Sequence, residues 1–198
     1  RAMVKTSLRF LQAPEAQREA LRLLAKAQTA WHHGLAVMVL SEALLRGFDD
    51  VDETLLQYCA LGALLHDIGI TRLPPETLCA PRRACSLEQE NQMRKHPILG
   101  AALCANLDLP IETLNCVLFH HEQMDGKGYP TGLGDGEIPF YVKVVQISNE
   151  FDTLTRKSDE GPGLTPFEAL NNLKASKDAY DIGMVKRLIL TLAGSHGA

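Results

Sequence analysis

Apolar residues recur along most of the chain with a spacing near 3.6 residues, the period of an amphipathic α-helix. Residues 14–47 carry this pattern first, and Gly47 suits the end of a helix there. Residues 50–69 pass from an acidic first turn into an apolar run, and Gly69 stands where a left-handed C-terminal residue is favoured. Residues 184–194 close the chain with the same period. The pattern predicts an all-α protein.

Polar residues and prolines mark where three further helices begin. Ser86 and Gln89 have the spacing of a capping box, in which two side chains bond reciprocally to backbone N–H groups. Pro110 suits the first helical position before an apolar run. Residues 165–168 combine Thr, Pro and Glu in a third N-terminal signature.

Residues 138–155 are ambiguous, because their many β-branched side chains would also suit a strand. However, Phe140, Val144, Ile147 and Phe151 keep helical spacing. We interpret this segment as a helix.

One domain is expected to span the whole chain. With 198 residues, of which 45% are hydrophobic, the chain can bury one good core. Residues 1–198 divide into an N-terminal helical segment, 1–28, a core of motifs, 33–155, and C-terminal helices, 165–198. The least regular stretches are expected to be extended loops: residues 71–86, 125–138 and 157–164.

Charge and composition disfavour several classes of function. A net charge of -4 and a pI of about 6.0 do not provide the basic surface that DNA or RNA binding needs. No apolar run reaches the roughly 18 residues of a membrane span. The first ten residues lack the layout of a signal peptide, so we expect a cytoplasmic protein whose start is cut from a longer chain or is an added remnant.

The cysteines form no C-x-x-C pair and are odd in number. We expect reduced thiols rather than a disulfide framework or a zinc ribbon. The five are Cys59, Cys79, Cys85, Cys104 and Cys116.

His66 and Asp67 stand together near the end of the helix predicted within residues 50–69. The pair could be a simple helix C-terminus, where a histidine interacts favourably with the helix dipole, or part of a metal site. The neighbours His120 and His121 raise a similar question, because adjacent residues on a helix point about 100° apart. Both side chains can face one ion if the end of the helix points at it. Otherwise they would coordinate the ion from two opposite sides.

Histidines on or beside apolar helical faces are unusually frequent. They are His33, His66, His96, His120 and His121. One such histidine is usually satisfied within a core, but five beside a fixed aspartate are hard to satisfy by hydrogen bonds alone. Neutral imidazoles bind iron, zinc, nickel or manganese, and a carboxylate can bridge two ions. The sequence therefore favours a metal centre.

Four motifs follow one another in the chain: "LLHDIG", "RKHPILGAAL", "HHEQMDGKGYPTGLGDGEIP" and "FDTLT". Through them the chain resembles the HD-GYP subgroup of the HD metal-dependent phosphohydrolases, over about residues 33–155. A His-Asp pair alone is weak evidence, whereas the glycine-rich turn after "HHE" is highly specific. The resemblance implies a helical fold, clustered metal ions that are often iron, and hydrolysis of the bacterial messenger cyclic di-GMP to linear pGpG or GMP.

The resemblance also implies which residues bind two metal ions. His33 matches the first metal histidine, and His66 and Asp67 match the catalytic pair that names the family, with Asp67 bridging both ions. The residues matched to the second ion are His96, His120 and His121. Two such ions would activate a water molecule and neutralise phosphate charge.

Residues 125–130 would shape the substrate side of the site. Contacts to substrate are expected from Lys127, Gly128, Tyr129 and Pro130, because glycines permit positive φ and a close approach to backbone N–H groups. Lys127 could instead be a solvated loop lysine, and Tyr129 could pack on the core in a rigid turn. The family's turn is also linked to docking of GGDEF-type cyclase domains, and a homodimer is left open.

Three departures from the family pattern weaken the site. Asn149 stands where an aspartate ligand is common, so it offers a carbonyl oxygen without charge and should weaken binding of at least one ion. Ile70 replaces a lysine found near the substrate phosphates. In residues 156–163, acidic side chains offset Arg156 and Lys157, which we interpret as a solvated helix end.

Other positions limit the number of ions. Thr29 stands where members with a third metal have a glutamate, so two ions are the upper expectation. His32 could substitute for His33, although the spacing to the His-Asp pair favours His33. Glu150 and Asp152 lie close to the missing carboxylate, but we expect neither to replace it.

Two functions from different classes follow. The first is a two-metal phosphodiesterase acting on cyclic di-GMP, which the retained histidines favour. The second is a regulatory domain that binds metal or dinucleotide without turnover, which Asn149 and Ile70 favour. A hydrolase for another cyclic dinucleotide or phosphoester is a third alternative.

Overall fold

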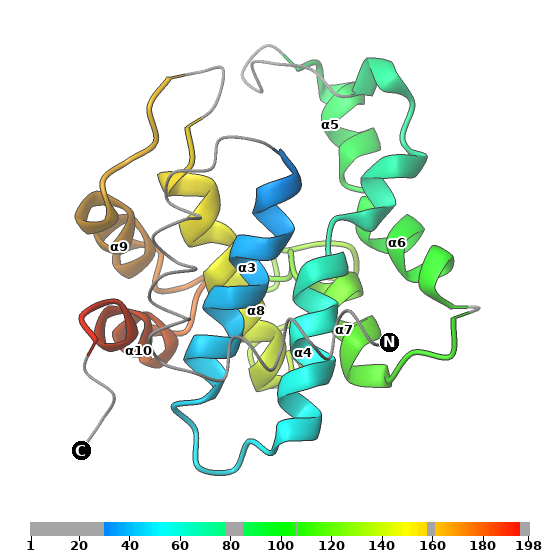
Figure 1. Ribbon diagram of the computed structural model, residues 1–198. Helices are drawn as coiled ribbons and strands as arrows, with labels where there is room; N and C mark the ends of the chain where they lie inside the picture. Colours follow the sequence, from blue (N-terminus) through cyan, green and yellow to red (C-terminus); the bar gives the residue numbers. More distant parts are fainter. Residues whose placement is uncertain (1–29, 78–84, 106, 158–160, 195–198) are drawn as a thin grey trace.

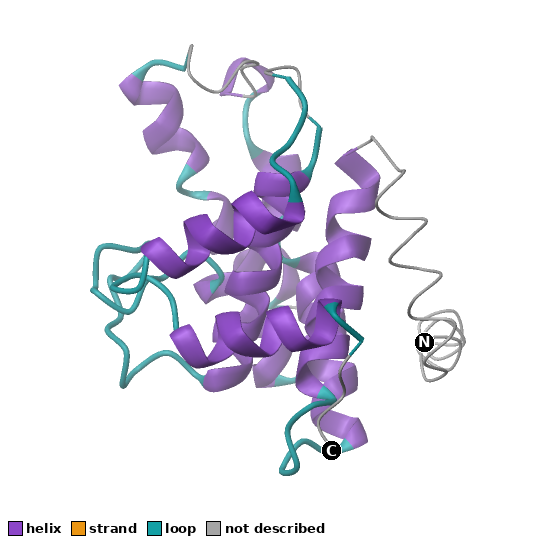
Figure 2. Ribbon diagram, turned by 90° about the vertical axis from the view of Figure 1, so that its left-hand side faces the viewer, coloured by secondary structure: helices purple, strands orange, loops and turns teal. Residues whose placement is uncertain are grey.

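The computed structural model describes four stretches of the chain: residues 30–77, 85–105, 107–157 and 161–194. The all-α prediction is confirmed for these residues, which form helices and loops without strands (Figure 2). An isolated β-bridge joins Asp125 and Gly134. No helix in the described stretches has the length and apolar character to cross a membrane. The expected N-terminal helical segment, 1–28, and Thr29 lie outside the described residues.

The helices follow one another in a simple order. The α-helices are α3 (Ala30–Leu45), α4 (Glu53–Leu65), α5 (Leu87–Met93), α6 (His96–Cys104), α7 (Ile111–Phe119), α8 (Phe140–Thr155), α9 (Pro166–Ala175) and α10 (Ile182–Leu192). Two short 3-10 helices, η1 (Ile68–Arg72) and η2 (Pro75–Thr77), follow α4.

The centre of the molecule is formed by α3, which packs against both α4 and α8, while α4 also packs against α7. In Figure 1, α9 and α10 lie on one side of this centre and α5 and α6 on the other. Fully buried side chains such as Leu44, Val117 and Ile147 fill the core. Burial of one such side chain stabilises the fold by about 1.5–3 kcal/mol, so the core holds the helix ends in fixed positions.

The interpretation of residues 138–155 as a helix is confirmed by α8. Val144, Ile147 and Phe151 are buried along one face of this helix. Burial of a face with helical spacing therefore outweighs the strand preference of its β-branched side chains.

The predicted helix starts agree with the structure to within one residue. Capping boxes are present at Ser86 and at Thr165. Pro110 is the residue before α7 rather than its first residue. At the other end of a helix, α3 stops at Leu45, two residues before Gly47.

The prediction for Gly69 was wrong. α4 ends at Leu65, and Gly69 lies inside η1 without a positive φ. A Cβ atom built on Gly69 would lie 1.9 Å from the carbonyl oxygen of His96. The glycine is therefore needed for close packing of η1 against α6, which sets Asp67 near His96.

The cysteines follow the prediction only in part. Cys59, Cys104 and Cys116 are free and buried, as expected. Cys85 is disulfide-bonded, so the expectation of a reduced thiol was wrong there. A disulfide requires two Cα atoms about 4.4–6.8 Å apart, and spacing along the chain does not determine that approach. Cys79 lies outside the described residues.

Candidate metal centre

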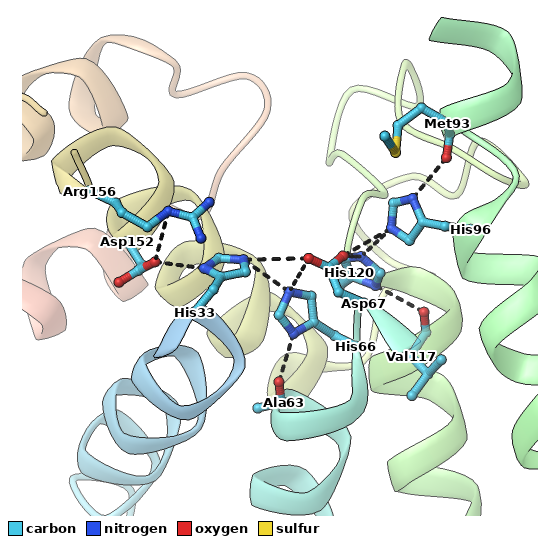
Figure 3. A network of polar contacts seen from close by, with 10 residues as sticks. All are labelled: His33, Ala63, His66, Asp67, Met93, His96, Val117, His120, Asp152 and Arg156. Carbon is cyan, nitrogen blue, oxygen red and sulfur yellow. Dashed lines mark hydrogen bonds and ion pairs between the residues drawn. The ribbon is translucent and has the colours of Figure 1, made fainter. Parts of the chain in front are cut away.

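Four helix ends converge on one cluster of histidines around Asp67 (Figure 3). His33 lies in the first turn of α3, and His66 is the C-cap of α4 and directly precedes Asp67. His96 is the first residue of α6, and His120 follows the last residue of α7. The structure thus brings together residues that are far apart in the sequence.

The Asp67 carboxylate lies between two pairs of imidazoles. Its Oδ2 is 3.4 Å from Nε2 of His66 and 3.7 Å from Nε2 of His33. Its Oδ1 is 3.3 Å from Nε2 of His96 and 3.7 Å from Nε2 of His120. Each oxygen therefore faces one pair, which is the arrangement that a bridging carboxylate requires.

Hydrogen bonds on the far side of four rings define their protonation. In each ring Nδ1 faces an oxygen that can only accept: Ala63 O for His66 (2.7 Å), Met93 O for His96 (2.8 Å), Val117 O for His120 (2.9 Å) and Asp152 Oδ2 for His33 (2.6 Å). We infer that Nδ1 carries the hydrogen in the neutral rings, so that Nε2 presents a lone pair to the cluster.

The inner face of the cluster is therefore rich in acceptors and poor in donors. Nε2 of His66 lies 3.2 Å from Nε2 of His33, and Nε2 of His96 lies 3.0 Å from Nε2 of His120. With lone pairs on both atoms of each pair and on Asp67, a shared cation satisfies what hydrogen bonding cannot. Imidazole nitrogens with a carboxylate suit iron, zinc, nickel or manganese. The residues present fit a metal centre.

Two groups of side chains could hold an ion. Their possible ligand atoms lie within 4.8 Å of one another in each group. The first group contains His33, His66 and Asp67, and the second contains Asp67, His96, His120 and His121. Asp67 belongs to both groups.

Burial and neighbouring charges shift the pKa values in this cluster. Burial alone would raise the pKa of Asp67, but the neighbouring His66 and the polar contacts with His120 and His96 lower it well below its usual range. Burial would lower the pKa of His66, yet the Asp67 charge raises it overall. Burial lowers the pKa of His120 to about 4. Burial and the nearby His120 and His96 lower that of His121 well below its ordinary value. His120 and His121 are therefore neutral near pH 7, as metal ligands must be.

The end of α7 explains how two adjacent histidines reach one site. The helix stops at Phe119, and His120 and His121 follow it with ring centroids 4.3 Å apart. The helix end thus points at the cluster, and both rings belong to the second group. This geometry favours the arrangement in which both rings face one ion from the end of the helix.

Asp152 on α8 contacts the cluster, which the sequence analysis did not expect. Its Oδ2 lies 2.6 Å from Nδ1 of His33 and 3.9 Å from Nε of Arg156. Asn149, which is 7% exposed, lies three residues earlier on α8 and so on the same helical face. The three-residue spacing from Asn149 to Asp152 was the sequence signal that could have placed Asp152 at the cluster. Glu150 lies off this face and hydrogen-bonds the Tyr180 side chain instead.

The residues expected to contact substrate lie in a loop beside the second group. The Tyr129 ring stacks on His121 with centroids 4.6 Å apart and planes 18° apart. The Tyr129–Pro130 peptide bond is cis. Lys127 has an 80% exposed side chain that pairs with Asp125 at 2.9 Å.

The two glycines near the tip of this loop have different roles. Gly126 adopts φ +73°, which favours glycine. Gly128 lies against its own chain, because a Cβ there would meet the backbone of Glu122 and Gln123 at 2.3–2.5 Å. The absence of a side chain at Gly128 therefore lets the loop pack closely against the backbone of Glu122 and Gln123.

Glu122 holds this loop from inside, a role that the sequence analysis missed. The side chain is 1% exposed and accepts hydrogen bonds from Thr131 N and Oγ1, Gly132 N and Leu133 N, at 2.6–3.2 Å. Its backbone follows directly on His121. A glutamate beside two adjacent histidines, ahead of a glycine-rich turn, was a usable signal for a buried acceptor.

Comparison with known proteins places this geometry in a family. The sequence model of the family described as "HD domain" matches residues 21–183. A cyclic di-GMP phosphodiesterase from Pseudomonas aeruginosa is 27% identical over 88% of this chain and 42% of its own length. The chain thus spans less than half of that relative.

Two solved structures share the fold. Bd1817 from Bdellovibrio bacteriovorus, described as a HDG"Y"P protein, aligns with a TM-score of 0.72 and 23% identity over 96% of this chain and 68% of that one. The HD domain of the L. monocytogenes phosphodiesterase PgpH, solved in complex with cyclic-di-AMP, aligns with a TM-score of 0.60 and 16% identity over 89% and 94%. The chain therefore belongs to the HD domain family, in the HD-GYP subgroup that its motifs indicate.

Proposed function

We propose that the chain is a metal-dependent phosphodiesterase that hydrolyses cyclic di-GMP to pGpG, GMP or both. The observation that carries the proposal is the Asp67 carboxylate, whose two oxygens each face one pair of imidazole Nε2 atoms. A centre with two cations side by side is suited to a phosphodiester, which carries negative charge on two non-bridging oxygens.

Each side chain has a proposed role in holding two ions, for which iron is our first expectation and manganese, nickel or zinc are alternatives. His33, His66 and Asp67, with the amide oxygen of Asn149, would hold the first ion. The second would be held by Asp67, His96, His120 and His121. The bound ions supply an activated water molecule and neutralise phosphate charge.

The surrounding residues orient the site and its substrate. The oxygens bonded to Nδ1 fix the ring positions, so the cluster is preorganised before an ion arrives. Gly128, Tyr129 and Pro130 would form one wall for the dinucleotide, with Lys127 at its edge. The named activity of the Pseudomonas relative supports cyclic di-GMP. The ligand of the PgpH domain makes cyclic-di-AMP the first competing substrate.

The proposed setting is bacterial second-messenger signalling in the cytoplasm. Residues 125–130 would also contact GGDEF-type cyclase domains, and a homodimer is compatible with the proposal. A specific observation favours the second candidate, a regulatory domain without turnover: Asn149 brings no negative charge, and Asp67 is the one carboxylate in the two candidate groups.

The test is a turnover assay on protein purified without oxygen, with metals counted in the same sample. The protein is incubated with cyclic di-GMP and Fe²⁺ or Mn²⁺, beside His66→Ala. We expect linear or mononucleotide product that is absent from the variant. Metal or dinucleotide binding without product would replace the enzyme by the regulatory domain. As a second control, Asp67→Ala is expected to lose both ions, and unchanged metal content would contradict the bridging role.

A further inference from the structure

Arg94 lies beside the candidate metal centre without a role in it. It is the C-cap of α5, lies two residues before His96 and is exposed to solvent. Its guanidinium carbon lies 5.1 Å from the centroid of the Tyr129 ring. Because Tyr129 also stacks on His121, a continuous series of contacts runs from Arg94 to the second group of ligands.

Unlike Lys127, Lys143 and Arg156, Arg94 has no carboxylate partner among the described residues. Lys127 pairs with Asp125, Lys143 with Asp135 and Arg156 with Asp152. No described ion pair involves Arg94, although its charge is permanent. Its positive charge is therefore available to an anion.

The position of Arg94 is fixed from both sides. Its backbone N–H donates to Gln92 O and Glu90 O at the end of α5, and the next residue but one begins α6. A guanidinium that lies over an aromatic ring keeps its N–H groups in its own plane, where they remain free to bind a phosphate in a bidentate manner. Tyr129 thus holds the cation without using its donors.

The chemistry of the substrate indicates what Arg94 binds. A cyclic dinucleotide carries two phosphodiester groups on opposite sides of its ring, and the metal centre can hold one of them. Ile70, in η1 after Asp67, offers no charge to the other. We propose that Arg94 binds the second phosphate, the one that is not being hydrolysed. This inference rests on the proposed function and adds a residue that selects for substrates with two phosphates.

The experiment compares a substrate having two phosphates with one having a single phosphate. Arg94→Gln, Arg94→Lys and wild type are loaded with Mn²⁺, and KM and kcat are measured for cyclic di-GMP and for bis(p-nitrophenyl) phosphate. Lys95→Gln is the matched control, because it removes one positive charge at the residue next to Arg94. Among the described residues, the Lys95 side chain hydrogen-bonds only to Gln92. Metals are counted in every sample, and cyclic di-GMP affinity is also measured by calorimetry with a non-hydrolysable phosphorothioate analogue.

We expect Arg94→Gln to raise the KM for cyclic di-GMP about tenfold and to weaken binding of the phosphorothioate analogue by a similar factor. Loss of a charge-assisted hydrogen bond predicts an effect of this size. Its metal content, and its KM for bis(p-nitrophenyl) phosphate, should stay within twofold of wild type. Arg94→Lys should lie between, since lysine keeps the charge but not the planar fork. Lys95→Gln should resemble wild type.

Each other outcome has a definite meaning. Unchanged affinity in Arg94→Gln, or an equal loss in Lys95→Gln, overturns the inference while the phosphodiesterase stands. An equal rise in KM for both substrates overturns the assignment to the second phosphate. Wild type that binds the analogue without hydrolysing cyclic di-GMP, and loses binding in Arg94→Gln, retains the inference and overturns the proposed enzyme. Wild type that neither binds nor hydrolyses the dinucleotide overturns both.

Discussion

Asp152 lies three residues after Asn149 on α8, and it acts on the centre through His33. By accepting a hydrogen bond from Nδ1 at 2.6 Å, it fixes the orientation of the ring and directs Nε2 toward the cluster. We expect Asp152→Asn to weaken metal binding about 10- to 100-fold, as losses of such partners typically do. Competition with a fluorescent chelator measures the effect, and Asp49→Asn, on the exposed α3–α4 connection, serves as the control. Equal affinities in wild type and Asp152→Asn would show that the hydrogen bond does not tune the ligand.

Asn149 offers the complementary change at the same helical face. Asn149→Asp adds one negative charge close to the first group of ligands while keeping the shape of the side chain. We expect more metal per chain after purification and, where the protein turns over cyclic di-GMP, a higher kcat. Elemental analysis of both proteins, prepared side by side, measures this. A fall in metal content would mean that Asn149 does not face the ion.

His120 predicts how the metal-free protein responds to acid. Its pKa is about 4 when folded, against an ordinary value of 6.5, because the ring is buried. A group with a depressed pKa leaves stability intact above its unfolded pKa and costs stability as the pH falls toward the folded value. Its contribution amounts to at most about 3 kcal/mol between pH 6.5 and 4. His121 acts in the same direction, and His66, whose pKa is raised, acts against it.

Urea unfolding in the presence of a chelator, at pH 7 and pH 5, measures this loss. Asp67 remains ionised between pH 7 and pH 5, because its pKa is lowered well below its usual range. We expect wild type to lose stability on acidification and His120→Leu to lose less. An equal loss in both proteins would show that His120 does not carry the effect.

At the scale of elements, the loop after α7 depends on Glu122. Its carboxylate accepts hydrogen bonds from three consecutive backbone N–H groups, and an amide in its place would turn an NH₂ group toward some of them. We expect Glu122→Gln to cost about 1–3 kcal/mol of stability and to speed amide exchange at residues 131–133. Glu137→Gln is the control, because Glu137 is exposed and caps a single N–H, that of Gly134. Unchanged exchange at 131–133 in Glu122→Gln would contradict this role.

Helix ends were harder to predict than helices. The apolar period identified α3, α4 and α8, because it reflects which face is buried. It could not show that α4 stops at Leu65, since that depends on the packing of η1 against α6 through Gly69. The site lies at these ends, so the part of the fold that carries chemistry was the part that local patterns describe least well.

For the whole molecule, the sequence predicted the all-α architecture and named the histidines that the fold brings together. It did not reveal Asp152, Glu122 or Arg94, because their roles depend on contacts with α3, the loop and Tyr129 respectively. Such contacts join residues separated by up to 119 positions and arise only once the helices pack. Ligand types can thus be read from composition and order, whereas the residues that orient ligands require three-dimensional proximity.

The convergence of four helix ends on one centre leads to a prediction about stability. Bound ions would join α3, α4, α6 and the end of α7, which otherwise meet through acceptor atoms that face one another. Ligand concentrations about 1,000 times Kd stabilise a folded protein by about 4 kcal/mol, which for a chain of this size raises Tm on the order of 10 °C. We expect calorimetry to show this difference between Mn²⁺-loaded and chelator-treated wild type. Asp67→Ala should unfold at the same temperature in both conditions, because it loses the carboxylate common to the two groups. A Tm that does not change in wild type, in samples shown to contain two ions per chain, would mean that the metals lie away from this junction of helices.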